Sequence, residues 1–189
     1  MSISRRRLAC LALPALAGAC SSPEPVLYTI QMRQGPVLPR GPRVVQLRDI
    51  GLPGYLDRRE IVRSAADYKL GVMSNDWWGE SLASMLSRVI IIGLSQRLPG
   101  SRIYPEGGAI SADSNAILGV NIQRMDLDAS GSLDLIAQAA VEFNRPTRSA
   151  AQTFHIVKAP PVNTVAGQVA ATSEAVAELT DGLATLLQT

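Results

Sequence analysis

The chain has 189 residues, two cysteines and one histidine, and its length is that of a single domain with a substantial core. Its 18 Lys and Arg exceed its 16 Asp and Glu, but three of the arginines lie within the first 19 residues. The remainder therefore has 15 basic residues and a net charge of −1. This balance gives no electrostatic indication of binding to nucleic acid or to anionic lipid headgroups.

Residues 1–19 have the pattern of a signal peptide. Three arginines at 5–7 precede an apolar stretch over 8–19, which is too short to span a membrane. Small residues at 17–19 lead directly to Cys20, an arrangement similar to the bacterial lipobox, in which the cysteine thiol is alkylated by a diacylglyceryl group. We therefore expect lipid attachment at Cys20 and a polar tether over 20–25. The alternative is cleavage before an unmodified Cys20.

Lipidation would anchor the chain at one end. Each buried CH₂ of an acyl chain contributes about 0.8 kcal/mol, and several chains together exceed what stable anchoring needs. Bacterial sorting rules favour the outer membrane when Ser rather than Asp follows the cysteine, as Ser21 does here, with retention in the inner membrane as the alternative. Cys10 lies in the signal peptide, so no pair remains for a disulfide.

The first half of the domain is predicted to begin with two strands, over 26–32 and 43–50, separated by a loop rich in Pro and Gly. A turn follows at 52–54, Leu-Pro-Gly, where Pro presets one backbone φ and Gly is expected to supply a positive one. Extended segments are predicted at 59–64 and 68–73. The pair Asp57 and Arg58 can be read either as a binding pair or as a surface ion pair.

The most apolar long segment, 75–98, predicts a core helix. Its apolar residues recur every three or four positions, Asn75 or Asp76 can cap its start, and Pro99-Gly100 ends it. Trp77 and Trp78 would then lie in its first turn, in the core or at the edge of the domain. Because the run 89–92 has no polar residue, we expect this helix to be covered nearly all round by a sheet.

The second half contains the clearest strand pattern. After a short strand at 102–104 and a loop over 106–114, apolar and polar residues alternate over 118–123, 133–143 and 154–156. Turn residues at 128–131 and 144–147 join these runs into an antiparallel meander with one buried face. A last helix over 164–187, capped by Asn163 or Thr164, carries an apolar face.

This order of elements predicts one α/β domain of the α+β type over 26–189. It would be a two-layer sandwich in which two long helices pack on a mixed, largely antiparallel sheet.

No catalytic chemistry is indicated. His155 is the single histidine, and it falls on the strand face opposite Phe154 and Ile156. No nucleophile or orienting acid accompanies it in the sequence, no Cys or His cluster has metal-ligand spacing, and no Gly-rich loop is placed to hold phosphate. We therefore expect neither enzyme activity nor a cofactor or metal, with an envelope hydrolase as the remote alternative.

Several motifs taken in order resemble the PqiC-type family, the auxiliary lipoprotein component of ABC-type envelope transport. They are the lipobox Cys20, Tyr28-Thr29-Ile30, Leu52-Pro53-Gly54-Tyr55-Leu56-Asp57-Arg58 with Ile61-Val62, the helix start from Trp77 or Trp78 to Leu82, Arg88-Val89, and Leu98-Pro99. The stretch 52–58 is the most specific of them. Family helices commonly open Trp-Ala-Glu-Pro-Leu, whereas this chain has Gly79 and Ser81 at the Ala and Pro positions.

The resemblance implies a non-catalytic periplasmic subunit, anchored to the outer membrane by its lipid and docking an MCE-domain protein that moves phospholipid across the envelope. Our hypothesis is that the turn at 52–58 presents the docking surface, because an exposed Tyr and Arg are residue types that dominate interface hot spots. The alternative is a stand-alone periplasmic carrier that binds an acyl chain between sheet and helix. Self-association is left open by the near-zero net charge and the Ala-rich last helix.

Overall fold

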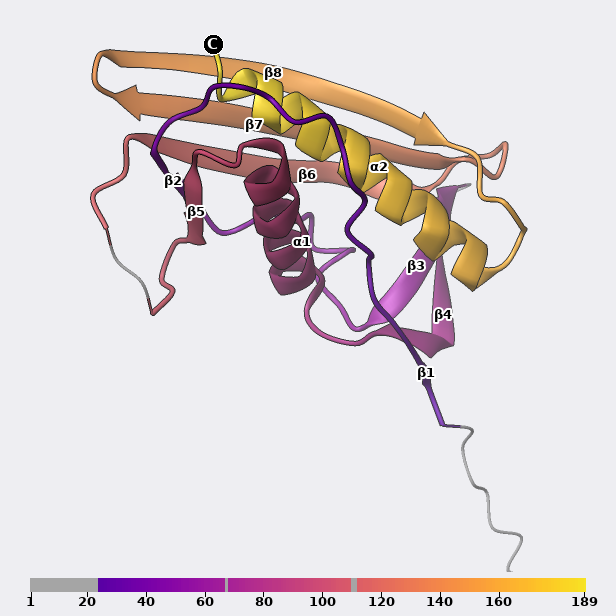
Figure 1. Ribbon diagram of the computed structural model, residues 1–189. Coiled ribbons are helices and arrows are strands. Elements are labelled where there is room, and N and C mark those ends of the chain that lie inside the picture. The colour runs from indigo at the N-terminus through magenta and orange to yellow at the C-terminus, as the bar shows by residue number, and fades with distance from the viewer. Residues whose placement is uncertain (1–23, 67, 110–111) are drawn as a thin grey trace, which may run out of the picture.

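The alternating second half of the chain forms the longest strands of the structure, a computed structural model that describes residues 24–66, 68–109 and 112–189 (Figure 1). The strands β6 (Ala116–Leu127), β7 (Leu133–Asn144) and β8 (Thr147–Lys158) are paired antiparallel, which confirms the predicted meander. The apolar residues of β7 alternate with exposed Gln138 and Glu142, because neighbouring side chains of a strand point to opposite faces. One face of the sheet is therefore apolar.

Strand β6 is the hub of one eight-stranded mixed sheet. It pairs with β7 along one edge, and with β2 and β3 at opposite ends of the other edge. The remaining strands are β1 (Val26–Tyr28), β2 (Val44–Leu47), β3 (Glu60–Ala66), β4 (Lys69–Trp78) and β5 (Arg102–Pro105). With two helices on the sheet, this arrangement confirms the predicted α+β class.

The last helix, α2 (Val165–Leu186), forms where it was predicted and lies across β7 and β8 of the sheet. The side chain of Thr164 caps it by accepting a hydrogen bond from the backbone N–H of Gly167 at 3.1 Å. The helix approaches β8 closely at Gly182, where an added Cβ would lie 2.3 Å from the Phe154 ring. The absence of a side chain at this position sets the spacing between the two layers.

The predicted core helix is shorter than expected. The structure places residues 75–78 in β4, and α1 (Leu82–Arg97) begins only after the N-cap Ser81. The reason is pairing on both sides of β4: Trp77 is opposite Glu60 of β3, and β1 pairs with Asp76–Trp78. Trp78 is nonetheless buried in the core.

Helix α1 is not covered all round, so that expectation was wrong. Leu86, Ile90 and Leu94 have no exposed surface, and burying each contributes about 1.5–3 kcal/mol. Ile92, however, is 45% exposed, because α1 packs against α2 and the sheet on one side only. The strip of this helix that faces solvent therefore combines the apolar Ile92 with the polar residues Ser84, Arg88 and Ser95.

The chain after β1 forms a strap rather than the longer first strand that was predicted. Residues 29–41 follow the two helices (Figure 1), and the backbone N–H of Gln31 donates to Ser173 Oγ of α2 at 3.1 Å. Further along, the N–H of Leu38 donates to the carbonyl of Arg97 at 2.7 Å. The strap ends at β2, which is also shorter than the predicted 43–50.

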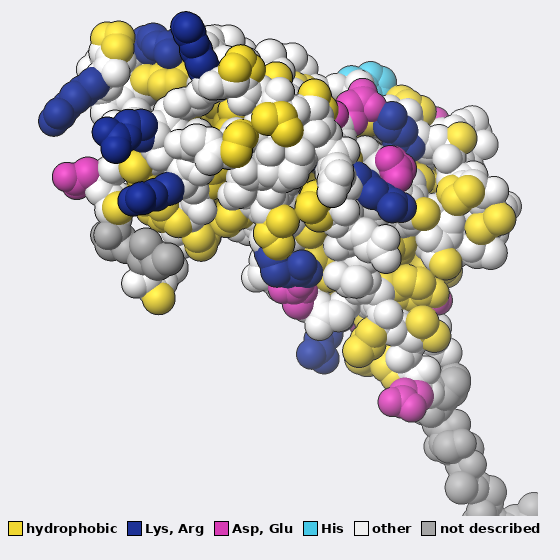
Figure 2. Space-filling view, in the orientation of Figure 1, with side chains coloured by type: hydrophobic (Ala, Val, Ile, Leu, Met, Phe, Trp, Pro, Cys, Tyr) yellow, Lys and Arg dark blue, Asp and Glu magenta, His cyan; other side chains and the backbone are white. Residues whose placement is uncertain are grey.

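The two ends of the molecule differ in their surface chemistry. Figure 2 shows Lys and Arg side chains gathered at the end where β7 turns into β8. At the other end, where the described chain begins, Val26 and Leu27 are 54% and 63% exposed. The predicted signal peptide and Cys20 lie outside the described residues.

Candidate functional site

The predicted turn at 52–58 is present and is fastened to the sheet at its start. The N–H of Gly51 donates to the carbonyl of Val120 at 3.0 Å, and its own carbonyl accepts from Ile122 at 2.9 Å. A hydrogen bond of 2.9 Å from the N–H of Leu56 to the carbonyl of Pro53 closes the turn. The positive φ expected at Gly54 is not observed, so this turn does not need glycine there.

Tyr55 fastens the turn to the sheet and is not one of its exposed residues. Its hydroxyl donates to Asp126 Oδ2 at 2.7 Å, and the side chain is partly buried, whereas an exposed Tyr was expected here. Burial, together with the hydrogen bond to Asp126, raises the pKa of Tyr55 well above that of a free tyrosine. Leu56 is buried in the core beside it, at 4% exposure.

Behind Tyr55 lies a charged network that the sequence did not reveal. Arg124 bridges two carboxylates, with Nη2 to Asp126 Oδ1 at 3.1 Å and Nη1 to Asp134 Oδ2 at 2.8 Å. Asp126 and Asp134 are directly opposite each other in the β6–β7 pairing. Two like charges in that register need a cation between them. The predicted turn at 128–131 would have placed Asp126 opposite Leu133, one position away from the observed partner, so the sequence predicted only the approximate pairing of these strands.

His155 is attached to the same network from outside. Its Nε2 lies 2.8 Å from Asp134 Oδ1, and its side chain is 62% exposed, so the predicted solvent-side position is confirmed. Among the described hydrogen bonds, Asp134 is its only side-chain partner, and no nucleophile is held against it. The network therefore neutralises buried carboxylates and fixes the turn to the meander.

The exposed part of the turn is small. Gly54, Asp57 and Arg58 are exposed, while the other four residues are partly or fully buried. Within the described chain, Asp57 and Arg58 do not form an ion pair, so both charges face solvent without a mutual contact. Such a tip can contact a partner through two opposite charges on a fixed backbone.

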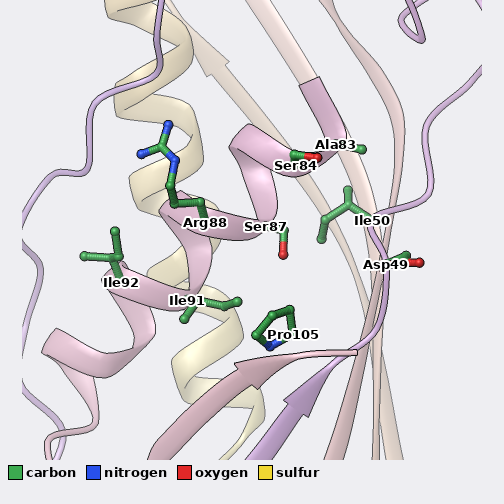
Figure 3. Close-up of a pocket in the computed structure, with 9 residues that line it drawn as sticks. All are labelled: Asp49, Ile50, Ala83, Ser84, Ser87, Arg88, Ile91, Ile92 and Pro105. Atoms are coloured by element: carbon green, nitrogen blue, oxygen red, sulfur yellow. The ribbon is translucent and has the colours of Figure 1, made fainter. Parts of the chain in front are cut away.

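A groove of about 650 Å³ lies beside this turn, between α1 and the segment that leads into 52–58. Figure 3 shows Ile91 of α1 directed toward Pro105 at the end of β5, with Ile50 facing Ser87 across the groove. Arg88 and Ile92 point away to its outer rim. The groove is open and mainly apolar, and it uses the strip of α1 that the fold leaves uncovered.

The space between sheet and helices, where an acyl chain was the alternative expectation, is occupied by side chains. Leu118 and Leu135 of the sheet and Val176 of α2 have no exposed surface. The described groove is at the outer edge of α1 instead.

The described residues contain neither a metal-binding cluster nor a membrane-spanning helix. No group of three or more His, Cys, Asp or Glu there could hold a metal ion. None of the helices described is long and apolar enough to cross a membrane.

Comparison with known proteins places the chain in a family. A family model described as the ABC-type transport auxiliary lipoprotein component matches residues 28–184. The chain belongs to this family. The matched range includes the whole turn at 52–58 and ends within α2, so the chain matches the family model over nearly all of the folded domain. The family resemblance read from the sequence is thereby confirmed.

Solved structures share the fold of this family member. A crystal structure of an uncharacterised protein is 15% identical, covers 86% of this chain and 98% of its own, and has a TM-score of 0.73. Protein XCC0632 from Xanthomonas campestris, of the family DUF330, is 18% identical, covers 85% and 94%, and has a TM-score of 0.70. At these identities the likeness concerns the fold alone. A search of the curated proteins found no match.

Proposed function

We propose that the protein is a non-catalytic, lipid-anchored periplasmic subunit of an envelope phospholipid transport system, which docks an MCE-domain protein to the outer membrane. The family match over residues 28–184 carries the proposal, because it associates the chain with ABC-type transport. The apolar stretch ending at Cys20 supports a lipid anchor, and Ser21 supports the outer membrane.

The docking surface in this proposal is the turn formed by Leu52, Pro53, Gly54, Tyr55, Leu56, Asp57 and Arg58. Its exposed tip would contact the partner, while Tyr55 and Leu56 hold the tip in place from beneath. A turn that is already fixed loses little conformational entropy on binding, which favours affinity. Arg58 supplies the hot-spot residue type, and the adjacent groove can receive an apolar side chain of the partner.

The test is a pull-down in mild detergent of the tagged, lipidated protein from its own envelope, followed by mass spectrometry. An MCE-domain protein should be recovered, and the double variant Asp57→Ala/Arg58→Ala should lower its yield by about tenfold. Lys158→Ala/Glu178→Ala is the control, because it also removes one acid and one base from the surface, at a site away from the turn. Equal recovery with the turn variant would show that 52–58 is not part of the interface. If no MCE-domain protein were recovered, the proposed partner would be wrong.

The groove beside α1 supports a second candidate, a periplasmic lipid carrier that holds an acyl chain there. Native mass spectrometry of the Cys20→Ala protein, purified without detergent, should then show one bound phospholipid. Ser87→Phe would fill the groove between Ile50 and Ile91 and abolish the adduct. A mass free of lipid in the unsubstituted groove would speak against the carrier.

A further inference from the structure

Five arginines from three separate segments meet at one end of the domain. Arg40 and Arg43 flank the end of the strap, Arg102 begins β5, and Arg145 and Arg148 flank the turn between β7 and β8. Together they line two adjoining hollows of about 330 and 310 Å³, which share Arg43 and Asn115. We call these five residues the arginine cluster. Its position corresponds to the concentration of basic side chains in Figure 2.

The arginine cluster contains more of the described chain's unpaired arginines than an even distribution over the surface would place there. The described residues include thirteen arginines, and five of them lie within 4.0 Å of a carboxylate. Of the other eight, five belong to the cluster. The near-zero net charge of the chain therefore hides a local excess of positive charge, contrary to what the composition indicated.

The guanidinium groups are presented on a formed surface. Arg148 lies over the ring of Phe143, with 3.8 Å between its guanidinium carbon and the ring centroid. Such stacking limits the rotamers of a long side chain and leaves its N–H groups directed outward. Asn115, at the boundary of the two hollows, is itself fixed by accepting from the N–H of Val44 at 3.1 Å.

The cluster lies far from the N-terminus that carries the predicted anchor. The strap follows α2 from Ser173, opposite Gln31, to Gln188, which donates to the carbonyl of Arg40. The thirteen helical steps from Ser173 to Leu186, where α2 ends, correspond to about 20 Å. The first described strand lies beyond the near end of that path, next to β4 (Figure 1). The described chain therefore begins at the end of the domain opposite the cluster.

We propose that the arginine cluster is a docking surface for a carboxylate-rich segment of a protein partner. Arginine is suited to this role because its planar fork of donors pairs with carboxylates through two parallel hydrogen bonds. The hollows between the guanidinium groups can receive single side chains, as a protein segment offers, whereas a bilayer presents a broad surface. The position remote from the anchor also favours a partner in the periplasm. This surface is separate from the turn at 52–58 and does not depend on the docking site proposed there.

Two glycines allow the partners of both surfaces to be mapped in the full-length, lipidated protein. Gly100 lines the hollow beside Arg43 and Arg102, and Gly54 lies at the tip of the turn. An added Cβ meets nothing within 4 Å at either position, and neither has a positive φ, so a photo-reactive side chain should be tolerated at both. After irradiation of cells, the crosslinked peptides are identified by mass spectrometry.

The expected result from Gly100 is a crosslink to a protein peptide with clustered Asp and Glu. Arg43→Gln/Arg148→Gln should reduce its yield by about tenfold, since each removes charge-assisted hydrogen bonds. Arg59→Gln/Arg63→Gln, which removes two charges elsewhere, should leave the yield unchanged. The thermal midpoints of all variants establish that each one is folded.

Other outcomes overturn the proposal. The proposal fails if Gly100 crosslinks to lipid alone or to a peptide without acidic residues. It also fails if Arg43→Gln/Arg148→Gln leaves the yield of the crosslink unchanged. Binding of the Cys20→Ala protein to phosphatidylethanolamine vesicles containing phosphatidylglycerol, lost in Arg43→Gln/Arg148→Gln, would assign the cluster to headgroups instead. Crosslinks from Gly54 report on the turn independently, so failure at one surface is distinguishable from failure at the other.

Discussion

At the scale of single residues, the hydroxyl of Tyr55 connects the candidate docking turn to the buried charges of the sheet. It donates to Asp126, whose side chain has no exposed surface and is also paired with Arg124. Removing the hydroxyl would leave a carboxylate oxygen with one partner fewer in a site that water does not reach. The contact spans 71 residues of sequence, so nothing local around Tyr55 indicated it.

The Tyr55 contact predicts a dependence of stability on alkaline pH. Because the folded state raises the pKa of Tyr55 above the usual 10.0, it holds the phenol proton more tightly than the unfolded state does. The resulting stabilisation is fully present below about pH 10 and is lost as the pH rises from there toward the folded pKa. Tyr55→Phe should therefore cost about 1–2 kcal/mol at neutral pH and lose less stability than the unsubstituted protein above about pH 10.

Urea unfolding at a series of pH values measures this difference. Tyr68→Phe is the control, because Tyr68 is fully exposed and its hydroxyl can remain hydrated. Parallel pH profiles for the unsubstituted protein and Tyr55→Phe would mean that the phenol proton is not held as the structure indicates.

At the scale of elements, the C-terminal turn of α1 connects three parts of the fold. Arg97 is 1% exposed, and its guanidinium pairs with Asp181 of α2 and donates to the carbonyls of Gly93 and Ala177 at 3.1 and 3.2 Å. It also donates to the carbonyl of Arg33 in the strap at 3.3 Å. A buried guanidinium is stable only with such partners, so this one residue holds α1, α2 and the strap together.

Asp181→Asn should destabilise the protein by about 1–3 kcal/mol, because it leaves the buried charge of Arg97 without its counter-charge while keeping the side-chain shape. Glu178→Gln, one turn earlier on α2, removes a partner of Lys158 that is half exposed and should cost less than about 1 kcal/mol. Urea unfolding at neutral pH and low salt measures both. Equal costs would show that the Arg97 pair is as well solvated as the surface pair.

The elements that sequence predicted well are those whose patterns are long. The alternation of apolar and polar residues predicted the meander. The long helical repeat of apolar residues after Thr164 predicted α2 and included its observed cap among the candidates. The start of α1 was misplaced because Asn75 and Asp76 are good caps, whereas their strand conformation is set by pairing with β1 and β3. The strap could not be predicted, since its partners on the helices are up to 142 residues away. The turn at 52–58 was located from local chemistry, but the buried state of Tyr55 was not.

At the scale of the whole molecule, the described chain begins at one end of the domain, and the arginine cluster lies at the other. The strap that connects the two ends is held by hydrogen bonds to α1 and α2. Folding of the domain should therefore be independent of what is attached at Cys20. In the proposed lipoprotein, the lipid would set the location of the domain, and the surfaces of the domain would set which partner it binds.

This separation predicts the behaviour of Cys20→Ala. The variant should leave the membrane fraction, because in the proposed lipoprotein the anchoring lipid would be attached at that thiol. Its thermal midpoint should equal that of the lipidated protein in the same detergent, because the hydrogen bonds that hold the strap backbone to the helices begin only at Ile30 and Gln31. Cys10→Ala is the matched control, since it removes the other cysteine within the signal peptide and should leave fractionation unchanged. If Cys20→Ala stayed in the membrane fraction after a high-salt wash, the domain itself would bind lipid through apolar contacts. The groove beside α1 would then be the first surface to examine, because salt would have removed any attachment through the arginine cluster.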